Sequence, residues 1–90
     1  MRVELSARAE EDLARIYDFN LERSVEWARR VHQRLLERSR ALAVAPFTGR
    51  PYRPAGVRQV SVTDIQYVID YRPAATVIEI LRFRSTREVR

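Results

Sequence analysis

Apolar and polar residues along the chain follow two different periods, which divide it into a helical first half and a strand-rich second half. Residues 9–21 carry apolar side chains at steps of three and four, the period of one face of an α-helix. The same period returns in residues 28–42 and must end before Pro46, because proline cannot continue a helix. The pattern therefore predicts two helices, each preceded by a serine, Ser6 or Ser24, that can cap its first turn.

Four shorter stretches alternate between apolar and polar side chains, as half-buried β-strands do. Residues 3–5 precede the helices, and residues 57–62, 66–71 and 76–83 follow them. The segment 46–56 contains three prolines and both glycines of the chain, and this composition predicts a loop. The turns between the last three strands are short enough for an antiparallel meander.

These elements predict a β-α-α-β-β-β order in a single domain spanning residues 1–90, since 90 residues is the length of one domain. The helices are joined by so few residues that they must fold back as a hairpin or meet at a sharp angle, and the expected fold uses the hairpin. The expected fold class is α+β, with the hairpin packed on one face of a small, mostly antiparallel sheet. The other face is then partly bare, and we expect tyrosines and arginines on it to shape a basic, aromatic groove.

The amino-acid composition limits where the protein can act and which kinds of catalytic and metal sites it can have. The chain has no cysteine, which excludes disulfides, thiol catalysis and cysteine-based zinc sites and favours a cytoplasmic location. We expect no targeting peptide, because the N-terminus lacks an apolar signal core, and no membrane partner, because no apolar run approaches the length of a span.

Positive charge is concentrated in the second half of the chain. All 17 basic residues are arginines, and the net charge is +5. A GC-rich genome favours arginine over lysine without any function, so the placement of the charge says more than its type. Residues 46–90 hold eight arginines against four acids, and this excess predicts an acidic partner, either nucleic acid or an acidic protein surface.

Groups that transfer protons or hold metals are scarce. His32 is the only histidine, and we expect it to be an ordinary solvent-facing residue of the second helix. One histidine cannot make a metal site, so neither a metal nor another cofactor is expected. Glu10, Glu11 and Asp12 fall in the first turns of the first helix, where acids complement the helix dipole, and we expect them to be solvated.

The arginines are therefore the main candidates for function. Guanidinium stays protonated and is a poor base, but it binds phosphates and carboxylates through a planar fork. We expect Arg58, Arg82 and Arg84 at adjacent or same-end strand positions, with Arg50 and Arg53 on the neighbouring loop. The alternative is a scattered basic surface paired with nearby acids. The candidate binding residues are Arg50, Arg53, Arg58, Tyr67, Tyr71, Arg82, Arg84 and Arg87.

Four short motifs, in this order and spacing, resemble the RelE/ParE superfamily of toxins from type II toxin–antitoxin modules, also called plasmid stabilisation proteins. They are LARIY at residues 13–17, PFTGRP at 46–51, YVIDYR at 67–72 and EILR at 79–82. The resemblance covers nearly the whole chain and implies the β-α-α-β-β-β fold. It also implies a cognate antitoxin, whose acidic, amphipathic segment folds onto the basic tail and groove of the toxin.

The superfamily has two main activities. The RelE branch cuts messenger RNA in the ribosome, whereas the ParE branch poisons DNA gyrase. RelE-like toxins tend to carry lysines before the second strand, an arginine on the middle strand of the meander and a tyrosine near the end. This chain has no lysine, and it has Val68 on the middle strand and Arg90 at the end. No residue is therefore an obvious candidate for the general acid that RNA cleavage needs. The resemblance thus favours a ParE-like inhibitor of gyrase.

Two alternatives stay open. One is a ribosome-dependent messenger RNA endoribonuclease with Arg58, Arg82 and Arg84 as its catalytic residues, clamping the phosphate. The other is an inactive member of the family that only binds its antitoxin.

Overall fold

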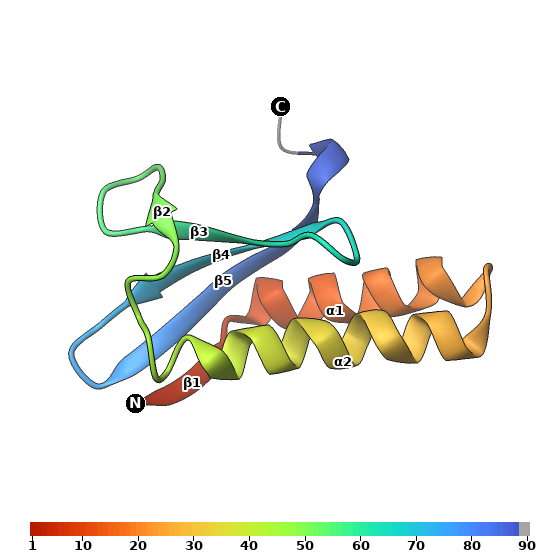
Figure 1. The fold of residues 1–90 in the computed structure, drawn as a ribbon, viewed down its shortest axis with the longest axis horizontal. Coiled ribbons are helices and arrows are strands. Elements are labelled where there is room, and N and C mark those ends of the chain that lie inside the picture. Colours follow the sequence, from red (N-terminus) through yellow and green to blue (C-terminus); the bar gives the residue numbers. More distant parts are fainter. Residues whose placement is uncertain (89–90) are drawn as a thin grey trace.

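A computed structural model describes residues 1–88 and confirms the α+β prediction, with two helices packed on one face of a five-stranded sheet (Figure 1). The described residues contain no helix that is both long and apolar enough to cross a bilayer. One strand, β2, was not predicted and lies inside the proline-rich loop. The elements are β1 (Arg2–Leu5), α1 (Ala7–Leu21), α2 (Val25–Ala41), β2 (Arg50–Pro51), β3 (Arg58–Val62), β4 (Tyr67–Pro73), β5 (Val77–Ser85) and a 3₁₀ turn, η1 (Thr86–Glu88).

Both predicted helix caps are confirmed. The Ser6 hydroxyl accepts a hydrogen bond from the Ala9 amide at 3.0 Å, and the Ser24 hydroxyl accepts one from the Trp27 amide at 3.0 Å. These bonds satisfy amides that have no partner inside the helix. The helix α2 ends at Ala41, five residues before Pro46, the latest point at which the sequence allowed it to end.

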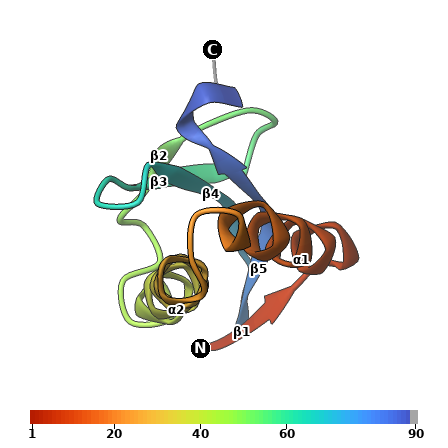
Figure 2. The same cartoon turned by 90° about the vertical axis from the view of Figure 1, so that its right-hand side faces the viewer.

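The strand order is β1-β5-β4-β3-β2, with β1 parallel to β5 and the other neighbours antiparallel. Figure 2 shows α1 and α2 side by side, viewed nearly along their axes. The short β1 pairs with β5 only as far as Ile80. Beyond that point the start of α1 takes its place: the Ser6 hydroxyl donates to the Leu81 carbonyl at 3.0 Å, and the Phe83 amide donates to the Asp12 carboxylate at 3.0 Å.

An irregularity in the β4–β5 ladder changes which side chains of β5 face the helices. Tyr71 pairs with Ile80 whereas Asp70 pairs with Arg82, so β5 holds one extra residue at this point. Strict alternation puts Phe83 and Ile80 on opposite sides of the sheet, and that expectation is wrong. Both side chains are buried in the one hydrophobic core, because a bulge resets the alternation.

Tyr67 and Tyr71 belong to the core, so the expectation that they line the uncovered face of the sheet is wrong. They share one side of β4, as alternation predicts, but this is the side that packs on the helices. The Tyr71 hydroxyl accepts from the Gly49 amide at 2.9 Å and donates to the Pro46 carbonyl at 2.8 Å. A Cβ atom at Gly49 would lie 2.7 Å from that hydroxyl oxygen, which explains the glycine.

Candidate functional site

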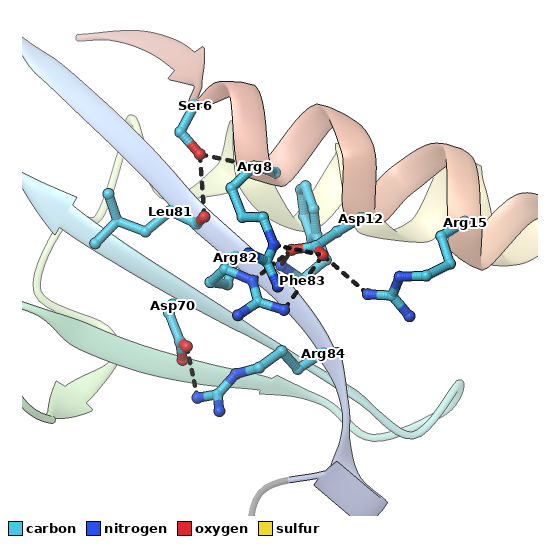
Figure 3. Close-up of polar contacts among 10 residues, drawn as sticks. Ser6, Arg8, Asp12, Arg15, Asp70, Leu81, Arg82, Phe83 and Arg84 are labelled. Carbon is cyan, nitrogen blue, oxygen red and sulfur yellow. Dashed lines mark hydrogen bonds and ion pairs between the residues drawn. The ribbon is translucent and has the colours of Figure 1, made fainter.

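A buried carboxylate on α1 organises the first cluster of arginines (Figure 3). Asp12 is only 1% exposed and accepts from Arg82 Nε at 2.8 Å, Arg82 Nη2 at 3.3 Å and Arg15 Nη2 at 2.9 Å, besides the Phe83 amide. The expectation that Asp12 is solvated is therefore wrong. The signal was its position: Asp12 lies three residues after Ala9 and four before Ile16, within the apolar stripe of the helix.

The environment of Asp12 keeps it ionised. Burial alone would raise the pKa of this carboxyl group, but the hydrogen bonds from Arg82, the Phe83 amide and Arg15 outweigh it and lower the pKa. The Arg82 guanidinium is thus fixed at the edge of β5 that β1 leaves uncovered, with its charge compensated by Asp12.

We expect part of the stability to be lost in acid through Asp12. Its folded-state pKa is lowered, so its contribution is complete above the ordinary aspartate pKa of about 3.9 and is lost as the pH falls through the lower, folded value. Urea unfolding of the wild type and of Asp12→Asn between about pH 7 and pH 2 measures this. The difference in unfolding free energy between the two proteins should shrink as the pH falls. A constant difference would show that the ionised carboxylate adds nothing.

A second polar network lies on the face of the sheet away from the helices. Arg84 donates to Asp70 at 2.6 Å and to the Tyr52 hydroxyl at 3.3 Å. Gln59 donates to the other oxygen of Asp70 at 3.0 Å, and Arg50 donates to Gln59 at 2.9 Å. Burial alone would lower the pKa of Arg84, but Tyr52 and Asp70 raise it, so this guanidinium stays charged and cannot act as a proton donor.

Arg58 lies apart from this network. It is opposite Tyr71 in the β3–β4 ladder and therefore points to the helix side of the sheet. Its guanidinium donates to the Gly49 carbonyl at 2.6 Å and lies 4.8 Å from the ring centroid of Phe47. The expectation that the three candidate catalytic arginines share one groove is wrong, because β3 and β5 present them on opposite faces.

The other predicted residues are dispersed. Arg53 is exposed in the loop after β2, and Arg87 is exposed in η1, whereas Arg90 lies outside the described residues. His32 is half-buried rather than fully solvent-facing, with its ring edge-on to Tyr17 at a centroid distance of 6.0 Å. Within residues 1–88 no three potential metal ligands come together.

The structure also forms a groove that the sequence did not reveal, which we call the hairpin groove. It lies between α1, the start of α2, the β3–β4 turn and the end of β5, and has a volume of about 700 Å³. Its buried members are Ile16, Asn20, Ile65 and Tyr67, with Trp27 half-buried, and its exposed members include Arg15, Phe19, Arg23 and Arg87. The only signal in the sequence was Phe19, a large apolar residue outside the stripe of α1.

Relatives of known family share this fold. The family described as ParE toxin of type II toxin–antitoxin system, parDE, matches residues 3–90. A chain of the chromosomal ParDE toxin–antitoxin system from P. aeruginosa is 26% identical, with a TM-score of 0.84 over 94% of this chain and 95% of that one. A chain of the toxin–antitoxin complex RelBE2 from Mycobacterium tuberculosis shares the fold at 22% identity, with a TM-score of 0.73 over 93% of this chain and 95% of that one.

No curated protein sequence matches the chain. The family match spans residues 3–90, nearly the full length, and agrees with the order of elements, the strand order and the helical hairpin described above. The chain therefore belongs to the ParE toxin family of type II toxin–antitoxin systems.

Proposed function

We propose that this protein is the toxin of a type II toxin–antitoxin module, that it inhibits growth by binding DNA gyrase in the cytoplasm, and that a cognate antitoxin neutralises it. Membership of the ParE toxin family supports the toxin assignment. Both solved relatives come from toxin–antitoxin systems, which supports an antitoxin as partner.

One observation favours a toxin that acts by binding over a nuclease: Arg82 and Arg84 of β5 both form ion pairs with carboxylates. Arg82 is bound to Asp12 at 2.8 Å and Arg84 to Asp70 at 2.6 Å. A nuclease needs cations that face the phosphate and a group that gives a proton to the leaving oxygen. An arginine can serve as the cation that faces the phosphate only when its guanidinium is not already bound to a carboxylate. It is a very poor proton donor to the leaving oxygen, because it stays protonated. The endoribonuclease alternative requires both ion pairs to open.

The test begins with growth and then separates the two targets. Expression without the antitoxin is expected to arrest growth, and the purified protein is expected to inhibit negative supercoiling of relaxed plasmid by gyrase. Primer extension on messages from the arrested cells should show no new ends. Adding the antitoxin should restore supercoiling, which controls for nonspecific inhibition by a basic protein.

Two results would contradict this function in different ways. Cleavage of messages at defined codon positions, with gyrase unaffected, would establish the endoribonuclease. Normal growth after expression, with antitoxin binding retained, would establish an inactive member of the family.

A further inference from the structure

The strand β1 forms an open edge of the sheet (Figure 1). Among the described residues its only neighbouring strand is β5, so one row of its backbone groups has no strand to pair with. The amides of Arg2 and Ser6 donate to carbonyls of β5, at 3.4 Å and 2.9 Å. Backbone groups alternate between the two edges of a strand, so those of Val3 and Leu5 point away from β5. An unpaired row of this kind is a template for another strand.

The two faces of β1 differ in character. The side chains of Val3 and Leu5 pack against the hydrophobic core, whereas those of Arg2 and Glu4 are 70% and 53% exposed. The charges of Arg2 and Glu4 cancel, so β1 is neutral although the whole chain carries a net charge of +5. A second copy of this basic chain can therefore approach β1 without local repulsion.

The sequence of β1 is complementary to itself when a second copy runs antiparallel to it. The outward-facing backbone groups exchange both hydrogen bonds only if residues of odd number lie opposite each other. With Val3 opposite its own copy, each Arg2 faces the Glu4 of the other copy, and a two-fold axis repeats this opposite-charge pair. Sliding one strand by two residues puts Arg2 opposite Arg2 in one direction and Glu4 opposite Glu4 in the other, and like charges directly opposite are destabilising. The charges therefore select a single register.

The second copy also compensates a like-charge contact within the chain. Glu4 lies opposite Glu79 in the β1–β5 ladder. On its other side Glu79 forms an ion pair with Arg72 at 3.6 Å, whereas Glu4 has only the exposed Arg2 of its own strand, at 3.4 Å. The Arg2 of a second copy gives each of the two carboxylates an arginine on the next strand.

A hollow on the helix side of β1 offers apolar surface to the second copy. It has a volume of about 460 Å³, and Met1, Val3, Leu5 and Leu36 are among the residues that line it. In the register above, Met1 of the other copy lies opposite Leu5, with its side chain on this same side of the sheet. Met1 is 50% exposed in the single chain, and a flexible thioether fills irregular spaces well. Pairing therefore buries apolar surface as well as backbone groups.

We propose that the chain self-associates through β1, and that two copies form a two-fold dimer in which their sheets are joined edge to edge. The inference goes beyond the proposed function, because it requires neither gyrase nor an antitoxin. Only residues 1–5 of each copy make the central contacts, so the interface is small and the expected dissociation constant is about 10–100 µM. None of these residues lines the hairpin groove, so pairing does not occupy that groove.

Reversing charges across the interface tests the register. Sedimentation equilibrium of the free chain between about 5 µM and 500 µM should show a monomer that becomes a dimer. Glu4→Arg leaves only like charges opposite each other in the selected register and should weaken association by about tenfold or more, as should Arg2→Glu. The double exchange of Arg2→Glu with Glu4→Arg restores opposite charges in the same register and should associate as the wild type does.

Two comparisons separate this pairing from general repulsion between basic chains. Arg2→Glu lowers the net positive charge, so general repulsion alone predicts stronger association rather than weaker. Glu22→Arg changes the net charge as Glu4→Arg does, at an exposed position in the turn between the helices, and should leave association unchanged. The substituted residues are all exposed, so circular dichroism should show every variant folded.

Backbone amides report directly which edge is covered. In the ¹⁵N-labelled protein, hydrogen exchange at the amides of Val3 and Leu5 should slow as the concentration rises through the dissociation constant, because these amides then donate to the other copy.

A chain that stays monomeric at about 500 µM would overturn the inference. A dimer that is insensitive to both single charge reversals, or in which the Val3 and Leu5 amides exchange as fast as in the monomer, would also overturn it, because the copies then meet elsewhere. Slow exchange of these amides only in a monomer bound to the antitoxin would assign this edge to the antitoxin instead of a second copy.

Discussion

Replacing Asp12 by alanine is expected to lower the free energy of unfolding by about 3 kcal/mol. Removing one partner of a buried ion pair costs several kcal/mol, and the part-exposed Arg82 recovers some of this by hydration. The substitution also leaves the buried Phe83 amide without an acceptor. Urea unfolding followed by circular dichroism at neutral pH measures the loss.

Two further variants show whether burial is the cause. Asp12→Asn keeps an acceptor for the amide but loses the charge, so its loss of stability should be smaller than that of the alanine variant. Asp64→Ala removes a carboxylate that is also bound by two arginines but is exposed to solvent, and its effect should be far smaller than that of Asp12→Ala. Equal losses for the two alanine variants would contradict the role given to burial.

Phe83→Ala is expected to cost about 3–5 kcal/mol, the range for deleting a buried aromatic ring. The side chain is 0% exposed and packs in the core that the sheet shares with both helices. Domains of this size are stable by roughly 5–15 kcal/mol, so the variant should melt well below the wild type. Thermal and urea unfolding measure the change.

The exposed Phe47 provides the matched control. The same substitution there removes a ring that is mostly in water, so the stability should change by about 0.5 kcal/mol or less. If both variants lost stability equally, or if Phe83→Ala were neutral, the placement of Phe83 in the core would be wrong.

The elements and the fold class were predictable from the sequence because their signals are local. The apolar stripes repeat within a few residues, and Ser6 and Ser24 cap helices that begin beside them. The proline-rich segment marked the long loop, although the two residues of β2 within it carry no pattern of their own. Strand order, by contrast, depends on contacts between distant segments and was not deduced.

The candidate site was predicted less well, because its geometry depends on contacts between residues far apart in the sequence. Arg82 and Asp12 are 70 residues apart, and the sequence marks this pair only by an acid within an apolar stripe. Alternation correctly grouped Tyr67 with Tyr71 but did not show which face the helices cover. The hairpin groove is formed by four separate segments of the chain. In the sequence, only Phe19, a large apolar residue outside the stripe of α1, indicated it.

The bulge in β5 makes the length of this strand as important as its composition. Ile80 and Phe83 both reach the core although an odd number of steps separates them, because the bulge takes up the extra residue. Inserting one more residue beside Leu81 would exchange the two surfaces of everything that follows, turning the phenyl ring outward and the neighbouring guanidinium groups inward, whereas deleting Leu81 would leave Ile80 and Phe83 on one side by ordinary alternation. Insertions should therefore be tolerated in the segment between β2 and β3, whereas the middle of β5 should not accept an added residue.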